Sequence, residues 1–282
     1  MSNQTAETPS GKAADDENFP VGSFLLPKPL RPHIALFYAF ARAIDDVADN
    51  PDLSPEDKCA RLDGFAAAIR GETQDAAYAK AVVLRPSLLK TGADPQHCLD
   101  LISAFKQDAV KTRYEDWNEL IDYCNRSAAP VGRYLLDIHG EDRSLYRYAD
   151  ALSNALQVIN HLQDCADDFA ELDRVYLPAD WMRQASVDVS ALAAPTCSPA
   201  LRQVLDRVLE GAGMLMQDAR RLPGPLVSRR LAAESAMIVR IADKLIGRLS
   251  DEDPIATRVE LSKPAYIACG AAGLFDVLLR RR

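Results

Sequence analysis

Apolar residues recur at every third or fourth position along most of the chain, whereas the strict alternation typical of a half-buried strand is almost absent. The stretch that begins at Ser54 shows the pattern most clearly. Its serine is a suitable N-cap, Pro55 takes the first helical position, and an apolar stripe follows that ends before Gly71. A second helix is predicted to open at Asp94 and Pro95. The pattern as a whole predicts an all-α protein.

Further helices are predicted over residues 116–137, 145–171, 199–220, 228–249 and 263–281. A kink is expected within 127–132, where small residues and a proline occur together. Residues 71–75 and 172–198 are predicted to be irregular. About eight helices of this length favour a bundle around a central apolar cavity. We therefore expect one helical domain over 19–282, after a disordered tail at 1–18 that lacks the apolar core of a signal peptide.

Charge and composition limit the kinds of molecule that the protein is expected to bind and the compartment in which it is expected to work. The net charge of -8 over 282 residues argues against a nucleic-acid surface but suits an anionic substrate delivered with metal ions. Six cysteines without a CxxC pair or zinc-ligand spacing favour a reduced, cytoplasmic protein. The longest uncharged apolar segment, residues 264–275, is shorter than the roughly 20 residues that span a bilayer. A peripheral contact with a membrane or a pathway enzyme stays open, although core packing is favoured for residues 264–279 and a solvated end for the arginines at 280–282.

A first acidic cluster ends the stretch FYAFARAIDDVADN, residues 37–50. In a helix, Asp45 and Asp49 share one face and lie about 6 Å apart along the axis, while Asp46 lies about 100° round. Carboxylate oxygens on one face can hold hard cations such as Mg²⁺, which keeps part of its shell for water and substrate phosphates. An EF-hand is excluded because no glycine occupies the sixth loop position. A solvated acidic triplet is the alternative.

A second cluster lies within residues 155–178, where Asn160, Asp164 and Asp168 follow one another at four-residue spacing on a largely apolar helix. Burying such a row is unfavourable unless something binds it. Asp167 is out of register, and we expect it to be exposed. If the two aspartate faces oppose each other in a bundle, they enclose a metal site at the mouth of the cavity. Two unrelated solvated faces are the alternative.

Four motifs in this order resemble the squalene and phytoene synthase family. They are FYAFARAIDDVAD, DAVKTRY at 108–114, YCNRSAAPVG at 123–132, and QVINHLQDCADD followed by DRVYLP. The resemblance covers about residues 18–180 strongly and the remainder only by helical pattern. It implies an all-α isoprenoid-synthase domain in which two aspartate motifs hold Mg²⁺, with Mn²⁺ as an alternative, against a substrate diphosphate.

The resemblance also implies roles for individual residues. The metal ligands would be Asp45, Asp49, Asn160, Asp164 and Asp168, of which the four aspartates are the catalytic candidates. Substrate-binding candidates are Arg42, Tyr38, Asn160, Gln163 and Arg174. For Arg42, a salt bridge to the neighbouring acids is an equal alternative. The aromatic residues Phe37, Tyr38, Phe40 and Tyr123 are candidates for the cavity wall, but core packing is favoured for them. We expect surface roles for Lys106 and Lys111, and packing or hydrogen bonding for His161.

Two departures from the family pattern indicate a branch. Condensing members carry an arginine where this chain has Gln163, and they commonly have a basic residue where it has Val21 and Gly22. Two cations that bind diphosphate are therefore missing. Four segments resemble the sequences of one branch of the family: ENFPVGS, RPHIALFYAFAR, YCNRSAAPVGR and NHLQDC. Members of that branch ionise presqualene diphosphate and let water capture the rearranged cation, which gives hydroxysqualene.

That branch needs no reductant, and the chain has no GxGxxG fingerprint, so no NADPH is expected. One alternative is a condensing enzyme that makes presqualene diphosphate from two farnesyl diphosphates, or phytoene from two geranylgeranyl diphosphates. A non-catalytic helical scaffold with acidic Mg²⁺ sites is another, and the presence of both aspartate motifs argues against it.

Overall fold

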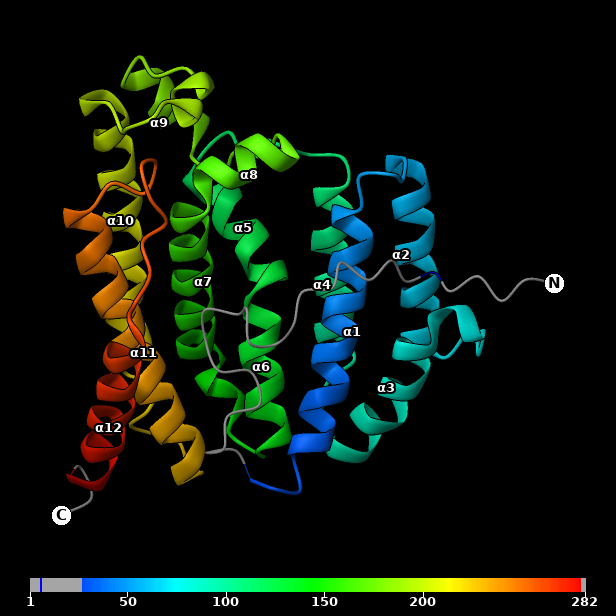
Figure 1. Cartoon of the computed structure of the whole chain (residues 1–282). Helices are drawn as coiled ribbons and strands as arrows, with labels where there is room; N and C mark the ends of the chain where they lie inside the picture. The colour runs from blue at the N-terminus through cyan, green and yellow to red at the C-terminus, as the bar shows by residue number, and fades with distance from the viewer. Residues whose placement is uncertain (1–5, 7–26, 280–282) are drawn as a thin grey trace. The chain divides into compact units, whose positions relative to one another are not determined.

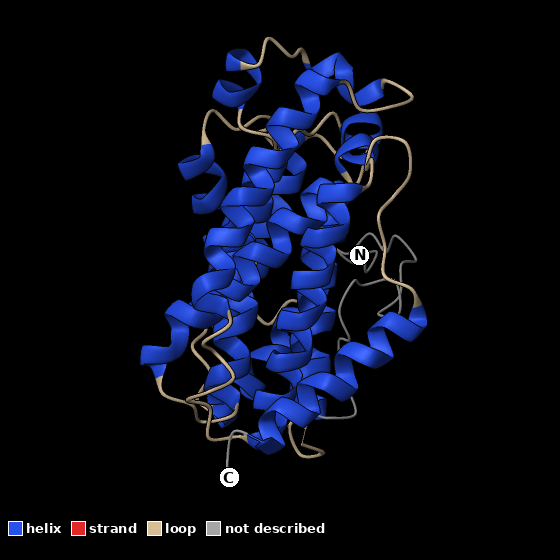
Figure 2. Ribbon diagram, turned by 90° about the vertical axis from the view of Figure 1, so that its left-hand side faces the viewer, coloured by secondary structure: helices blue, strands red, loops and turns tan. Residues whose placement is uncertain are grey.

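Helices form all the regular secondary structure of the described residues in this computed structural model (Figure 2). The structure describes residue 6 and residues 27–279, apart from the side chains of 277–279. The α-helices are α1 (Arg31–Asp49), α2 (Pro55–Arg70), α3 (Ala79–Thr91), α4 (Gln96–Asp108), α5 (Trp117–Ser127), α6 (Ala129–Ile138), α7 (Tyr146–Gln163), α8 (Cys165–Leu172), α9 (Ala179–Gln184), α10 (Pro199–Ala219), α11 (Arg229–Asp251) and α12 (Lys263–Leu279). Three short 3-10 helices, η2 (Ala76–Tyr78), η3 (Arg143–Leu145) and η4 (Val189–Ala193), accompany them. The predicted all-α class is confirmed.

The chain divides into two compact units. The first comprises Met1–Lys111 and Pro130–Arg143, and the second comprises Thr112–Ala129 and Ser144–Arg282. The expectation of one domain over residues 19–282 stays a prediction. Within the predicted disordered tail, Ala6 is buried, and its N–H donates to the carbonyl of Ala77 at 3.0 Å. The remainder of that tail, the Val21-Gly22 segment and residues 280–282 lie outside the described residues.

The ends of α2 follow from local sequence. The Ser54 hydroxyl accepts a hydrogen bond from the N–H of Asp57, and Pro55 begins the helix. Gly71 ends it with φ at +83°, in the left-handed region that a residue without a Cβ adopts most easily. The predicted boundaries of this helix are confirmed.

The core of the first unit surrounds α1, which contacts α2, α3 and α4 (Figure 1). The Phe37 ring stacks on Tyr134 of α6, with centroids 3.9 Å apart, and Phe40 meets Phe65 of α2 edge to face. Both phenylalanines are therefore packing residues, as favoured from the sequence. Tyr38 is half-buried.

Helix α3 was not expected from the sequence, and it forms although Pro86 lies inside it. Its buried positions Ala81, Leu84 and Leu88 pack within the core cluster of this unit. Tertiary burial therefore outweighs the loss of one helical hydrogen bond at the proline.

Two of the long predicted helices are each divided in the structure. Residues 116–137 form α5 and α6, which are separated at Ala128, within the region where a kink was expected. Residues 145–171 form α7 and α8, separated at Asp164, and the prediction of one continuous helix there is wrong. The stretch 172–198, predicted to be irregular, contains the short helices α9 and η4.

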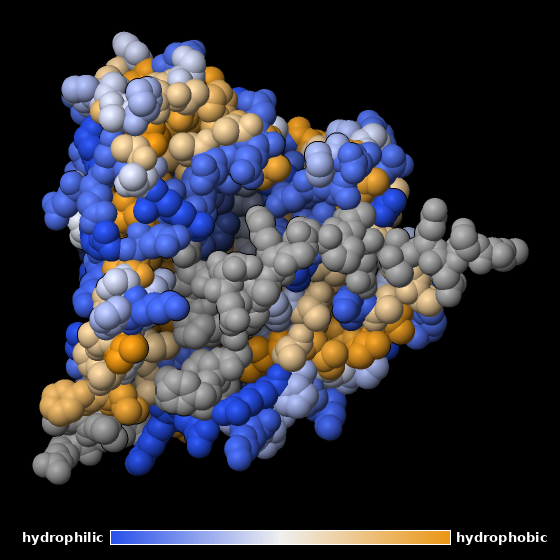
Figure 3. Space-filling model, in the orientation of Figure 1, coloured by the Kyte–Doolittle hydropathy of each residue, from blue (hydrophilic) through white to orange (hydrophobic). Residues whose placement is uncertain are grey.

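In the second unit, α7 contacts α5, α10 and α11, and α12 lies along α11 (Figure 1). Core packing of α12 is confirmed for one face only, where Cys269 and Gly273 are buried. Its other face exposes Ile267 by 73%, Leu274 by 45% and Phe275 by 59%, and apolar side chains gather there in the space-filling view (lower left of Figure 3). Among the described residues, no helix is sufficiently long and apolar to cross a membrane.

Candidate functional site

The first aspartate motif occupies the last turns of α1, where Asp45, Asp46 and Asp49 are all half-buried. Arg42, one turn earlier, lies with Nη1 3.1 Å from Oδ2 of Asp45 and Nε 3.4 Å from Oδ1 of Asp46. The salt bridge proposed as an alternative for Arg42 is therefore present. The Arg42 guanidinium therefore lies beside both carboxylates.

Burial and, after it, the nearby carboxylate of Asp49 raise the pKa of Asp45 to about 7, although Arg42 opposes the shift. Asp46 and Asp108 add smaller repulsions. Several acidic groups thus share a site where one guanidinium does not balance them. A divalent cation would relieve this repulsion, and carboxylate oxygens are the donors that Mg²⁺ prefers. The residues present fit such a metal.

The second motif spans the junction of α7 and α8. Asp164 has φ −105° and ψ 5°, outside the helical range, so α8 turns away from the axis of α7 (Figure 1). Two backbone hydrogen bonds nevertheless keep the four-residue spacing of the motif across the junction. The N–H of Asp164 donates to the carbonyl of Asn160 at 2.9 Å, and the N–H of Asp168 donates to the carbonyl of Asp164 at 2.7 Å. Asn160, Asp164 and Asp168 are half-buried, while Asp167 is exposed as expected.

A segment far along the chain contacts this junction. The side-chain amide of Gln163, which is 2% exposed, donates to the carbonyl of Val259 at 2.5 Å. Arg258 then reaches the next residue of the motif, with Nη2 2.9 Å from Oδ1 of Asp164. The sequence left this motif without its arginine, whereas the structure places a guanidinium beside it. Arg258 lies outside every recognised motif, and no local signal could have identified it.

The other recognised motifs meet in one cluster of rings within the second unit. Tyr114 and Tyr123 lie 5.3 Å apart, and Tyr176 lies 5.4 Å from Tyr114 and 5.7 Å from Tyr123, between ring centroids. The His161 ring stacks on Tyr176 at 3.5 Å. Burial and, after it, the charge of Arg174 lower the pKa of His161 to about 3, so the ring is neutral and packs, as predicted. Sequence reasoning missed Tyr114 and Tyr176, although both lie within the quoted motifs.

Backbone contacts join the same motifs. The N–H of Val175 donates to the carbonyl of Thr112 at 2.9 Å, and Arg113 forms an ion pair with Asp173 at 2.6 Å. Arg174, a candidate for substrate binding, is buried and lies close enough to His161 to contribute to the low pKa of that ring. The loop after the second motif is thus held against the DAVKTRY segment.

One of the two predicted surface lysines forms a visible ion pair. The Nζ of Lys106 lies 2.7 Å from Oδ1 of Asp63, in an ion pair on the surface of the first unit.

The predicted metal ligands fall into two sets, one on α1 in the first unit and the other at the α7–α8 junction in the second. Within the described part of the chain, no group of three or more His, Cys, Asp or Glu side chains is arranged to hold a metal.

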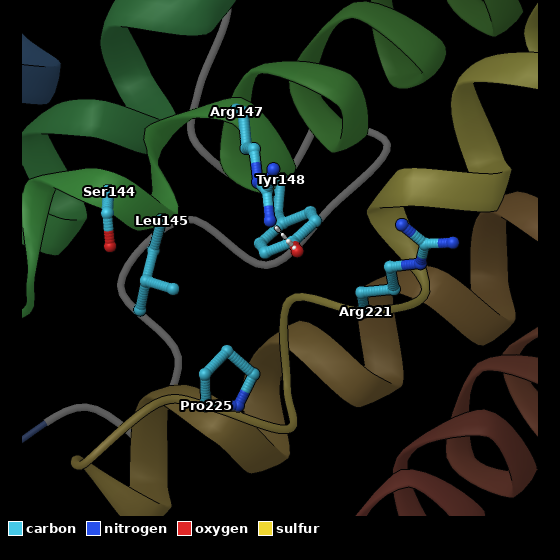
Figure 4. A pocket seen from close by; sticks show the side chains of 6 residues that line it. All are labelled: Ser144, Leu145, Arg147, Tyr148, Arg221 and Pro225. Carbon is cyan, nitrogen blue, oxygen red and sulfur yellow. Dashed lines mark hydrogen bonds between the residues drawn. The ribbon is translucent and has the colours of Figure 1, made fainter.

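An open pocket of about 580 Å³ lies at the start of α7 (Figure 4). Its lining residues are Ser144, Leu145, Arg147, Tyr148, Arg221 and Pro225. The guanidinium of Arg147 lies over the ring of Tyr148, 4.3 Å from its centroid. The pocket includes none of the predicted site residues and lies roughly 24 Å along α7 from Asp164.

Residues 12–265 match the family described as squalene/phytoene synthase. The chain belongs to the squalene/phytoene synthase family. It is similar to the hydroxysqualene synthase of Rhodopseudomonas palustris, with 40% identity over 98% of this chain and 94% of that protein. The hydroxysqualene synthase of Zymomonas mobilis is 42% identical, over 90% of this chain and 86% of that protein.

Among solved structures, a squalene synthase (HpnC) from Alicyclobacillus acidocaldarius matches with a TM-score of 0.73 and 30% identity, covering 84% of this chain and 90% of that one. Membership of the squalene/phytoene synthase family confirms the resemblance noted in the motifs. Family members ionise diphosphates and are in general metal-dependent. The chain is an enzyme of this type, which excludes the non-catalytic scaffold.

Proposed function

We propose that this protein is a hydroxysqualene synthase. Presqualene diphosphate loses its diphosphate, the resulting cation rearranges, and one water molecule adds, so that hydroxysqualene, diphosphate and one proton are formed. The observation that carries this proposal is the 40% identity to a hydroxysqualene synthase along nearly the whole of both chains. The balanced reaction consumes one water molecule and no reductant.

Asp45, Asp49, Asn160, Asp164 and Asp168 are the residues that would hold Mg²⁺, with Mn²⁺ as the alternative. Bound metal would neutralise the charge that develops on the departing diphosphate. The chain adds positive charge of its own at the first motif, where Arg42 lies beside Asp45. Charge-assisted hydrogen bonds from a guanidinium to phosphate oxygens are stronger than neutral ones, so Arg42 favours the separated ion pair over the intact ester.

Water must reach the cation only after rearrangement, so the site has to exclude bulk solvent until then. The buried ring cluster of Tyr114, Tyr123 and Tyr176 supports this requirement.

The test supplies purified protein and Mg²⁺ with presqualene diphosphate, farnesyl diphosphate or geranylgeranyl diphosphate in separate reactions. We expect hydroxysqualene and diphosphate from the first substrate and no C30 or C40 product from the others. The runner-up, a condensing enzyme, predicts presqualene diphosphate from farnesyl diphosphate, or phytoene from geranylgeranyl diphosphate. Turnover of either of these alone would refute the proposal.

We also propose that the exposed apolar face of α12 rests on a membrane. Ile267, Leu274 and Phe275 lie on this face, and the proposed substrate and product both carry a C30 hydrocarbon skeleton that partitions into bilayers. The basic residues at 280–282 follow directly in the sequence, which favours anionic lipid.

Co-sedimentation with vesicles of phosphatidylglycerol and phosphatidylcholine checks this proposal. Phe275→Glu is expected to lower the bound fraction several-fold, because it places a charge on the apolar face. Leu89→Glu, on the equally exposed surface of α3, is the matched control and should bind as the wild type does. Equal binding by all three proteins would exclude α12 as the contact.

A further inference from the structure

Two neighbouring residues at the end of α7 contact two neighbouring residues of a distant segment. Gln163 pairs with Val259, and Asp164 pairs with Arg258. The Gln163 amide donates to the Val259 carbonyl, and the Arg258 guanidinium contacts both Asp164 oxygens, at 2.9 Å and 3.2 Å. These pairs are separated by 96 and 94 positions in the sequence. The contact is therefore a purely tertiary one.

The two contacts differ in burial. Gln163 and Val259 are 2% and 1% exposed, so their hydrogen bond lies inside the protein. The Arg258 side chain is 40% exposed and that of Asp164 is 28% exposed. A neutral amide can satisfy a buried carbonyl without burying a charge, whereas an arginine confined at this position would lose most of its hydration. The cation thus lies at the accessible end of the contact and the neutral group at the buried end.

Further bonds hold the segment that carries Arg258. The carboxylate of Asp253 accepts from the N–H of Cys197 at 2.8 Å and from the N–H of Ile255 at 2.9 Å. Beyond Arg258, the guanidinium of Arg248 donates to the carbonyl of Glu260. Arg258 therefore extends from a backbone that is anchored on both sides, with the Gln163 bond directly next to it.

We infer that Gln163 is a positioning residue, whose amide fixes the backbone at Val259 so that Arg258 supplies the positive charge which condensing family members carry at position 163. The inference rests on the proposed diphosphate chemistry. In this chain, the charge arrives from the C-terminal segment instead of from the motif itself. Arg258 pairs with both Asp164 and Glu260 before the ligand binds, so its charge is beside the motif when a diphosphate arrives.

The first measurement is calorimetric binding of inorganic diphosphate in the presence of Mg²⁺. Arg258→Gln is expected to weaken this binding by about 10- to 100-fold, because it removes a charge-assisted contact. Gln163→Met keeps the length and apolar bulk of the side chain but removes the donor, and it should weaken binding in the same direction. Arg183→Gln breaks the exposed ion pair with Glu115 in the same unit and is the matched control, with wild-type affinity expected.

The decisive measurement is the double variant. If Gln163 acts through Arg258, then Gln163→Met adds little to Arg258→Gln, because the residue being positioned is already absent. Gln163→Arg combined with Arg258→Gln should recover part of the lost affinity. Wild-type binding by Arg258→Gln, or losses that add in the double variant, would overturn the inference.

Two controls distinguish a failure of this inference from misfolding of a variant and from a failure of the proposed function. Helix content and thermal midpoint are recorded for each variant, and Gln163→Asn replaces Gln163→Met if the latter loses helix. Inorganic diphosphate contains no organic part, so the cycle is informative whichever prenyl substrate the enzyme uses. Failure of presqualene diphosphate to turn over would refute the proposed function and leave the Gln163–Arg258 coupling standing.

Discussion

At the scale of single residues, Glu234 is an exception to the usual pairing of buried charges. It lies on α11 with 4% exposure, and its Oε2 has no hydrogen-bond partner. Burial raises the pKa of its carboxyl to about 7 from an ordinary 4.5. The folded protein therefore retains a proton that the unfolded chain releases as the pH rises from about 4.5.

This difference makes stability depend on pH in a definite direction. Below pH 4.5 both states carry the proton and Glu234 has no effect, and between 4.5 and 7 deprotonation progressively favours the unfolded chain. Glu234→Gln removes this loss. The variant is therefore expected to gain stability over the wild type as the pH rises. The difference between their free energies of unfolding should be greater at pH 8 than at pH 5.5 by up to about 2 kcal/mol.

Urea denaturation at the two pH values measures this difference. Glu210→Gln, on the exposed face of α10, is the control and should show no such trend. A relative stability of Glu234→Gln that falls with pH would contradict the assignment.

At the scale of elements, α12 approaches α11 closely through a glycine. A Cβ at Gly273 would lie 2.6 Å from the backbone nitrogen of Met237 and 2.9 Å from its Cα. Backbone atoms cannot move aside as a flexible side chain can. Gly273 therefore sets the spacing of the two helices.

Gly273→Ala is expected to destabilise the protein by roughly 1–3 kcal/mol, because α12 must shift to relieve the overlap. The matched variant is Gly247→Ala on α11, where a Cβ meets no atom within 4 Å. Alanine there should stabilise the helix by about 0.5–1 kcal/mol. Thermal unfolding of both variants measures the contrast, and equal shifts of the same sign would contradict the close approach.

At the scale of the whole molecule, ligand binding and folding are linked. Mg²⁺ together with inorganic diphosphate should raise the thermal midpoint by about 5 °C at saturating concentration, since a ligand that binds only the folded state stabilises it. Asp164→Asn should abolish this shift by removing a proposed ligand. Asp167→Asn, on the exposed side of α8, should retain it. Equal shifts in the two variants would remove Asp164 from the site.

Much of the architecture follows from the sequence alone, because it depends on contacts within a few residues. The limits of α2 come from Ser54, Pro55 and Gly71, whose preferences are local. Helical spacing by itself places Asp45 and Asp49 on one face of α1. The motifs led to the squalene/phytoene synthase family, to which the chain belongs. The catalytic roles assigned to individual aspartates stay predictions.

Other features depend on residues that are distant in sequence, and only the tertiary structure decided them. Helix α3 forms around Pro86 because its apolar face is buried in the core of the first unit. The break at Asp164 interrupts a helical pattern that continues in the sequence on both sides. The sequence shows that position 163 carries no arginine, but it gives no sign that Arg258 places a guanidinium beside Asp164. Arg258 lies 94 positions beyond Asp164, and periodicity reports only on neighbours within a turn or two.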